Sequence, residues 1–170
     1  MRRVLWAIAI GAIVAATLGA ASPKTAPKPA TPAARPDFSG RWELDLARTD
    51  FGPQKTKPRA RVDVISHRDP SLTVETMTVR SDGDTVRYPW RFMTDGTETK
   101  NKLMGQDVTS IGGWRADTLT FDSSAQVMMA EFRTVDRWRL SPDRSILTIH
   151  RHSDSPMGKS DQRFVFVRRK

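Results

Sequence analysis

Residues 37–46 read DFSGRWELDL, and this stretch alternates apolar and polar side chains along the chain. The residues of its apolar face are Phe38, Gly40, Trp42, Leu44 and Leu46. Charged and hydroxyl side chains occupy the positions between them, so the period is two residues, as in a strand with one buried face. The folded part of the chain is therefore expected to begin with a strand that encloses other elements.

The rest of the chain consists of short stretches rich in Val, Thr, Ile and aromatic residues, separated by turn residues. The turn sequences are HRDPS at 67–71, SDGD at 81–84, TDGT at 94–97, RADT at 115–118 and SPDR at 141–144. Asp-Gly permits the positive φ of tight hairpins, and Pro suits the second position of a type I turn. No apolar stretch keeps a helical period beyond about two turns, so the domain is predicted to be all-β.

Strands joined by such short turns pair antiparallel as an up-and-down meander of about 8–10 strands. The predicted strands are 38–47, 60–67, 71–80, 84–93, 97–104, 107–114, 118–124, 126–140, 145–152 and 162–169, with longer loops at 48–59 and 153–161. Trp-Arg recurs every 24 residues, at 90–91, 114–115 and 138–139, which is about the span of one hairpin. Equal hairpins favour closure into a barrel, because closure removes exposed strand edges.

The first 21 residues have the layout of a secretory signal peptide. Arg2 and Arg3 precede an apolar stretch that ends in small residues, and this layout fits cleavage after Ala21. The alternative is an uncleaved N-terminal anchor, because the apolar stretch is about long enough to span a bilayer. We expect an exported protein, either periplasmic or extracellular, or else anchored and facing the periplasm.

Residues 22–36 contain five prolines, no acidic residue and no large apolar side chain. This composition cannot bury enough surface to fold, so we expect a disordered Pro/Ala/Lys-rich linker of polyproline character. Residues 37–170 then form one domain, the predicted barrel. The chain contains no Cys, which excludes disulfides, thiol catalysis and zinc–thiolate sites within it.

The net charge of +9 arises largely from the two ends of the chain. The basic residues before position 37 are Arg2, Arg3, Lys24, Lys28 and Arg35. The last three residues, RRK, are basic as well. The excess within the domain is mild, so we expect no nucleic-acid partner.

Two predicted strands carry aromatic residues at alternate positions, and these faces are expected to point inward. The candidate cavity wall is Tyr88, Trp90, Phe92, Phe132, Thr134, Asp136 and Trp138. Met128 shares the inward parity, and the six methionines after position 37 would make such a pocket deformable. A buried Asp136 needs a partner. Either it meets an inward Arg or hydroxyl, or a bulge turns it outward.

The opening strand also carries a family resemblance. Gly40-Arg41-Trp42 resembles the Gly-x-Trp signature of lipocalins and related calycin barrels. DFSGRWELDLARTDFGP, RYPWRFMTDGTETKN and DRWRLSPDRSILTI together are similar to a group of exported bacterial proteins described as lipocalin-like. The resemblance implies that Gly40 and Trp42 are structural, and that Trp42 packs across one end of the barrel beneath an arginine from a late strand. The possible partners are Arg151, Arg163 and Arg168.

The chain shows no catalytic signature: it has no phosphate-binding loop, dinucleotide fingerprint, zinc-protease helix motif or nucleophile elbow. We therefore predict no catalytic residue, no cofactor and no metal site. His150 and His152 project together on one strand, but no third ligand is evident, and a solvated strand end is the simpler interpretation. An outer stripe of arginines is expected at positions 87, 91, 133, 137, 139 and 151; most such stripes are solvated faces.

Two functions remain open. The first is a lipocalin-like barrel that binds a small apolar or amphipathic ligand without catalysis. The second is a cell-envelope interaction module with a solid core, which binds a protein, glycan or lipid headgroup through its outer face or the loops 48–59 and 153–161. Barrels of this size occur both filled and hollow, so the packing of the interior decides between them.

Overall fold

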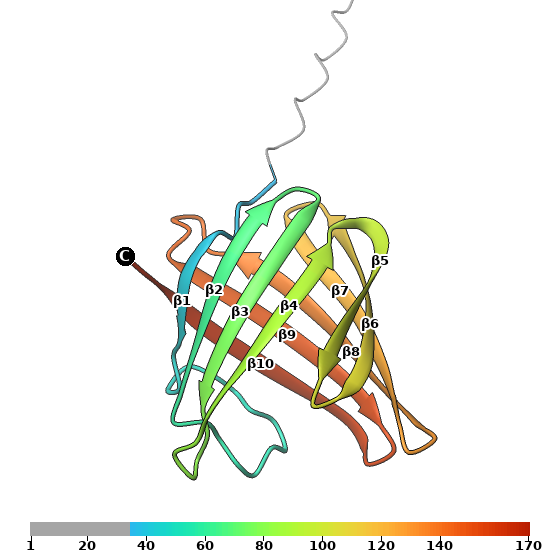
Figure 1. The fold of residues 1–170 in the computed structure, drawn as a ribbon. Coiled ribbons are helices and arrows are strands. Elements are labelled where there is room, and N and C mark those ends of the chain that lie inside the picture. The colour runs from blue at the N-terminus through green and yellow to red at the C-terminus, as the bar shows by residue number, and fades with distance from the viewer. Residues whose placement is uncertain (1–34) are drawn as a thin grey trace, which may run out of the picture. The chain divides into compact units, whose positions relative to one another are not determined.

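A computed structural model describes residues 35–170 of the chain, and these form ten β-strands (Figure 1). The strands are β1 (Gly40–Leu44), β2 (Ala60–Arg68), β3 (Ser71–Val79), β4 (Thr85–Met93), β5 (Asp95–Leu103), β6 (Gln106–Arg115), β7 (Thr118–Val127), β8 (Ala130–Leu140), β9 (Ile146–Ser155) and β10 (Gly158–Arg169). The all-β prediction is confirmed. The expected signal peptide at 1–21, and all but two residues of the expected linker at 22–36, lie outside the described residues.

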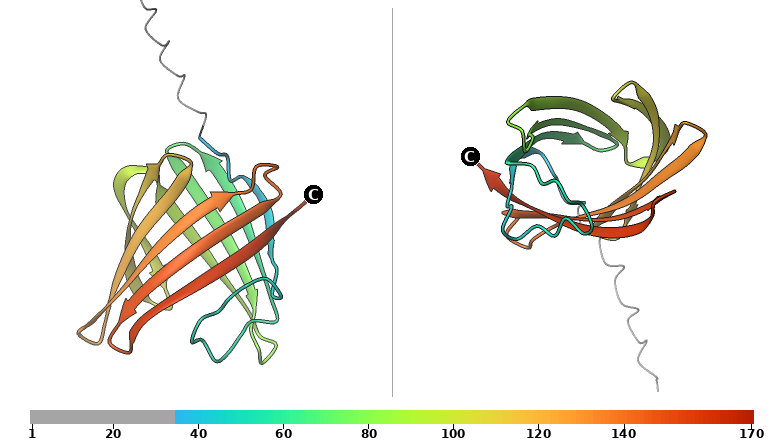
Figure 2. Two further views of the ribbon diagram at one scale, coloured as in Figure 1. Left: turned by 180° about the vertical axis from the view of Figure 1, so that it is seen from behind. Right: turned by 90° about the horizontal axis from the view of Figure 1, so that it is seen from below.

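The strands make one antiparallel sheet in the order β4-β3-β2-β1-β10-β9-β8-β7-β6-β5. Every ladder but one joins strands that are consecutive in the chain, and the exception pairs β1 with β10. The sheet curls into a nearly closed barrel, as the view along the strands shows (Figure 2). β4 and β5 stand at the two ends of the strand order, so a seam without a backbone ladder lies between them in the described part of the chain. The predicted meander and barrel are confirmed.

Within residues 35–170 there is no helix that is long and apolar enough to cross a membrane.

The antiparallel order gathers alternate turns at the same end of the barrel. One end carries the β2–β3, β4–β5, β6–β7 and β8–β9 turns, and we call it the tryptophan end because Trp42 and Trp114 pack near it. The fully buried side chains next to these turns are Phe38, Trp42, Leu72, Leu119 and Leu147, each at 0% exposure. The densest part of the core therefore closes the tryptophan end, as expected for the opening strand.

The opposite end carries the long β1–β2 loop and the β3–β4, β5–β6, β7–β8 and β9–β10 turns (Figure 1). Four methionines at its hairpin tips are exposed: Met104, Met128, Met129 and Met157. We call this the methionine end. The expectation that Met128 lies inside is wrong, because the residue sits in the β7–β8 turn and is 97% exposed. The other two of the six methionines, Met77 and Met93, have the outward parity of β3 and β4, so none of the six lines the interior.

Two strand boundaries differ from the sequence prediction at this end. The expected loop at 153–161 is a hairpin, since β9 continues to Ser155 and β10 begins at Gly158. The expected long strand at 126–140 is broken by a turn in which Met128 and Met129 have φ of 49° and 67°. Turns with positive φ normally carry Gly, Asn or Asp, so a Met-Met turn gives no recognisable signal.

Candidate ligand-binding cavity

A cavity of about 340 Å³ lies inside the barrel and is lined by residues from β2 to β9. Its volume falls at the lower end of the range of about 300–1,000 Å³ that small-molecule sites occupy. All seven residues predicted for a cavity wall line it: Tyr88, Trp90, Phe92, Phe132, Thr134, Asp136 and Trp138. The structure thus brings together side chains that are up to 50 positions apart in the sequence. Their contact with a ligand stays a prediction.

Aromatic rings build one wall of this cavity. Trp90 stacks on Phe92 with ring centroids 6.0 Å apart, and Phe92 lies 4.3 Å from Phe121. Phe121 in turn meets Trp138 edge-to-face at 5.3 Å. Such offset and edge-to-face contacts hold each ring in place. The wall is therefore apolar and well ordered, and it continues from β4 through β7 to β8.

The charged part of the cavity lining consists of two arginine–aspartate pairs. Arg61 and Asp63 both face inward on β2, and two hydrogen bonds of 3.0 and 2.8 Å join them. Arg151 on β9 faces Asp136 on β8 in register and donates two hydrogen bonds of 2.7 and 2.6 Å. Asp136 therefore meets an inward Arg, which was one of its two open alternatives. Arg151 does not belong to the expected outer stripe, because its strand parity matches that of the buried Ile149.

The arginine side chains are partly buried, and aromatic rings cover them. The guanidinium carbon of Arg61 lies 5.3 Å from the ring centroid of Phe166, and that of Arg151 lies 5.5 Å from Phe164. Burial opposes the charge on Arg151, but the carboxylate of Asp136 outweighs this effect and raises the pKa of Arg151 above its usual value. Arg151 consequently stays charged inside the barrel.

Sequence reasoning missed Arg61 and Asp63. The signal that could have revealed them is parity, since Arg61 and Asp63 lie four and two positions before the inward-facing Ile65 and share its face of β2. Charged residues at such positions usually indicate an outer face. The folded structure explains the inward position of Arg61, because its guanidinium lies over the rings of Phe164 and Phe166 on β10.

A second cavity of about 320 Å³ lies beneath the β1–β2 loop. Phe51 packs in it against Phe164, and the Gln162 amide donates to the Phe51 carbonyl at 2.9 Å. Arg61 and Arg151 line both cavities. The charged pairs therefore stand at the boundary between the aromatic cavity and the space under the loop.

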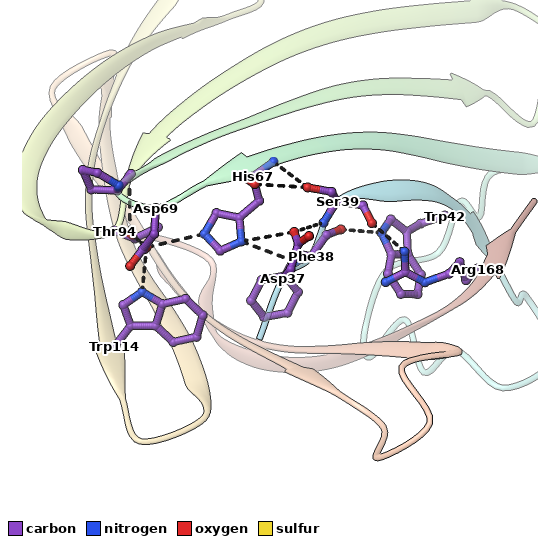
Figure 3. A network of polar contacts seen from close by, with 10 residues as sticks. Asp37, Phe38, Ser39, Trp42, His67, Asp69, Thr94, Trp114 and Arg168 are labelled. Atoms are coloured by element: carbon purple, nitrogen blue, oxygen red, sulfur yellow. Dashed lines mark hydrogen bonds and ion pairs between the residues drawn. The ribbon is translucent and has the colours of Figure 1, made fainter. Parts of the chain in front are cut away.

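The tryptophan end is built as the opening strand predicts (Figure 3). The Trp42 indole donates to the Phe38 carbonyl at 2.8 Å, and the guanidinium carbon of Arg168 lies 4.3 Å from its ring centroid. Arg168 is thus the partner among the three candidates. Gly40 has a φ of 139°, and a Cβ there would lie 2.6 Å from a guanidinium nitrogen of Arg168. Only glycine leaves room for this arrangement.

At the same end, Asp69 accepts hydrogen bonds from the side chains of Arg35, Thr94 and Trp114. Figure 3 shows the Thr94 and Trp114 side chains beside it. Partial burial opposes its ionisation, but donors from Thr94, Arg35 and Trp114 outweigh burial and lower the pKa of Asp69 to about 2. The buried His67 lies next to it, with Nε2 3.5 Å from the carboxylate. This cluster ties the β2–β3 turn to β6 and to the residues that precede β1.

The two histidines on β9 do not form a metal site with other residues. His152 contacts Asp161 at 2.8 Å, and His150 is exposed. Nowhere in residues 35–170 do three His, Cys, Asp or Glu side chains come together in a way that could hold a metal ion. Of the arginines in the expected outer stripe, Arg133 pairs with Asp122 and Arg139 with Asp117.

The chain matches no known family model and no curated protein sequence. Its backbone does match solved structures. A secretory abundant heat soluble protein from Ramazzottius varieornatus superposes with a TM-score of 0.56 at 9% identity, over 78% of this chain and 95% of the other. This barrel has the calycin-type fold.

Two further calycin-type barrels bear this out. Zebrafish ileal bile acid-binding protein, in complex with cholic acid, gives a TM-score of 0.51 at 11% identity. Fatty-acid-binding protein 1 of Echinococcus granulosus gives 0.50 at 8% identity. Each alignment covers 78% of this chain and 98% of the other. At these identities the likeness establishes the calycin-type fold alone.

Proposed function

We propose that this calycin-type barrel is an exported protein that binds a small apolar or amphipathic molecule in its interior, without catalysis. The observation that carries the proposal is the 340 Å³ cavity behind the aromatic wall. Two proteins of the same fold are a bile acid-binding protein in complex with cholic acid and a fatty-acid-binding protein. The cavity favours this function over the interaction module, whose premise is a solid core.

Binding would rest on removing apolar surface from water. Each methylene group that moves into the cavity contributes about 0.8 kcal/mol, and the fixed rings of Trp90, Phe92 and Trp138 already hold the shape of the wall. Thr134 and Asp136, at the polar side of the cavity, would position a polar end. The absence of catalysis is supported by the two neighbours of the same fold, whose names describe them as binding proteins.

Native mass spectrometry of the full chain, purified from its expression host, tests this function. We expect an additional mass of a small molecule that disappears after organic extraction and returns when the extract is added back. A Trp90→Ala variant should retain less of that mass, because Trp90 lines the cavity. A chain that carries no adduct, and whose fluorescence no apolar compound changes, would contradict the proposal.

Export is the second part of the proposal, and it is supported by the layout of residues 1–21. Cleavage after Ala21 would release the protein into the periplasm or the medium, while an uncleaved segment would anchor it facing the periplasm. The intact mass of the protein from cell fractions tests this directly. A mature chain that begins at Ser22 supports secretion, and a full-length mass in the membrane fraction supports the anchor. A full-length mass in the cytosolic fraction would contradict both.

A further inference from the structure

The cavity beneath the β1–β2 loop, here called the loop cavity, has a basic lining. Its charged lining residues come from four separate elements: Lys57 from the loop, Arg61 from β2, Arg80 from the β3–β4 turn and Arg151 from β9. No aspartate or glutamate among residues 35–170 lines it. Cations gathered around one space repel each other unless an anion lies between them. The lining therefore indicates a site for an anion.

The aspartates that pair with the two arginines face the other way. Asp63 and Asp136 line the aromatic cavity and not the loop cavity. Each accepts from Nε and Nη2 of its arginine, so Nη1 of Arg61 and of Arg151 makes no hydrogen bond with any group in the described chain. The two arginine side chains are 23% and 32% exposed. Each guanidinium therefore keeps N–H donors for a second acceptor at the boundary of the two cavities.

An aromatic pair holds three of the cations around one point. The guanidinium carbons of Arg61 and Arg151 lie 5.9 and 5.5 Å from the ring centroid of Phe164. Phe51 meets this ring edge-to-face at 6.1 Å, and Nζ of Lys57 lies 5.4 Å from the centroid of Phe51. Both rings line the loop cavity. A bound anion could therefore be reached from the barrel wall and from the loop at once.

Two of the cations are not balanced by a close carboxylate. Lys57 forms no ion pair within residues 35–170, and Arg80 faces Asp82 at 3.7 Å, with both side chains more than half exposed. Such an exposed pair contributes little, so both cations are available to a ligand. A phosphate monoester carries close to two negative charges at pH 8, since its second pKa is about 6. The lining also offers hydroxyl groups, from Thr56, Thr78 and Ser81.

We propose that the loop cavity binds the phosphate of a phosphate monoester whose apolar tail lies in the aromatic cavity. Arg61, Thr78 and Arg151 line both cavities, so the two spaces adjoin. A phosphate suits this lining better than a planar carboxylate, because its three free oxygens point in different directions, as the cations do. The proposal rests on the cavity-binding function argued above and adds the head group of the ligand.

Isothermal titration of the full-length protein at pH 8 with decyl phosphate, decan-1-ol and decanoate tests the head group. The three probes share one alkyl chain. We expect decyl phosphate to bind at least about tenfold more tightly than decan-1-ol and several-fold more tightly than decanoate. Its advantage over the alcohol should shrink in about 0.5 M sodium chloride, which screens charge.

The outcomes separate the head group from the binding function. If decan-1-ol binds and decyl phosphate binds no more tightly, the phosphate site is overturned while the cavity-binding function stands. Decanoate that binds as tightly as decyl phosphate would overturn the assignment to phosphate. If none of the three probes binds, the binding function fails, and this inference fails with it.

Inorganic phosphate distinguishes a head group from a free anion. It should bind at least about a hundredfold more weakly than decyl phosphate, because it buries no apolar tail. Trp90→Ala should weaken decyl phosphate and decan-1-ol alike, since Trp90 lines the aromatic cavity. Inorganic phosphate that binds as tightly as decyl phosphate, or decyl phosphate binding that Trp90→Ala does not change, would overturn the placement of the tail.

Two lysines of the same loop provide matched variants that locate the site. Lys57→Gln removes a cation of the lining and should weaken decyl phosphate binding at least about threefold. Lys55→Gln removes the same charge two positions away, but Lys55 does not line the cavity, so binding should change little. Both residues are exposed, and neither substitution should impair folding. Equal effects of the two variants would show that the phosphate does not lie in the loop cavity.

Discussion

The side-chain amide of Asn101 on β5 makes both hydrogen bonds that the backbone of Arg91 on β4 offers toward the seam. Its oxygen accepts from the Arg91 N–H at 2.8 Å, and its nitrogen donates to the Arg91 carbonyl at 2.9 Å. One side chain thereby reproduces the pair of bonds that a neighbouring strand would supply. Because Asn101 is only 8% exposed, water cannot readily replace it.

Replacement of Asn101 by Ala should lower the free energy of unfolding by about 1–3 kcal/mol, since it leaves the Arg91 N–H and carbonyl without a partner. Urea denaturation measures the loss. Gln126→Ala is the control, because it removes an exposed strand amide that makes no side-chain hydrogen bond in the described residues. The Arg91 amide should also exchange its hydrogen faster in Asn101→Ala, but not in Gln126→Ala. Equal stability of the two variants would show that the amide does not hold the seam.

Stability should fall in acid because of Asp69. Its pKa is lowered from 3.8 to about 2 in the folded protein, so its contribution is present above about pH 4 and is lost as the pH falls toward 2. Asp69→Asn should be less stable than the native protein at neutral pH, and the gap should narrow between pH 4 and 2. Urea denaturation midpoints between pH 7 and pH 2 measure this difference in stability. Asp82→Asn, in the exposed β3–β4 turn, is the control. A gap that stays constant with pH would contradict the ionised role of Asp69.

The β5–β6 turn should accept a stabilising substitution. Met104 and Gly105 have φ of 52° and 84°, which is the pattern of a type I′ turn, where Asn-Gly is favoured. Met104→Asn should therefore raise the free energy of unfolding by about 1 kcal/mol. Met157→Asn provides the comparison, because Met157 is also an exposed hairpin methionine but has no positive φ. If both variants gain the same stability, the effect comes from replacing an exposed apolar side chain with a polar one and not from the backbone conformation.

Arg168 should not tolerate lysine. Its guanidinium donates to the carbonyls of Ser39 and Arg144 at 2.5 and 2.9 Å while it covers the ring of Trp42. An ammonium group cannot make these planar contacts together, so Arg168→Lys should cost about 1–3 kcal/mol. Arg169→Lys, which changes an exposed pair with Glu43, should stay within about 0.5 kcal/mol. Thermal unfolding distinguishes them, and equal effects would refute the special role of Arg168.

The alternation of residues predicted most of this fold and the aromatic part of the candidate site. Where turns contained Asp-Gly or Pro, as at 81–84 and 141–144, the strand ends lay close to the prediction. The Met-Met turn failed because its backbone conformation has no residue signal. Strand parity correctly predicted that Trp90 and Trp138 point into the interior. Successive residues of a strand point to opposite faces, whichever strands lie beside it.

The polar part of the site and the partner of Trp42 could not be read in the same way. Choosing Arg168 requires the register of β1 on β10, which local patterns do not contain. The inward position of Arg61 depends likewise on what lies opposite it, here Phe166. Both are properties of strands that are far apart in the sequence, and only the folded barrel brings them together.

The single ladder between β1 and β10 has a consequence for how the barrel forms. Hairpins between consecutive strands can form in about 1–10 μs, but Glu43 and Arg169 must meet across 126 residues of chain. We expect this non-local closure to limit the folding rate, because its loop entropy is lost before its contacts are gained. During synthesis, β1 has only β2 to pair with until β10 emerges. The strands of the interior therefore stay open until the final segment arrives, and a ligand can be enclosed only when the chain is complete to β10.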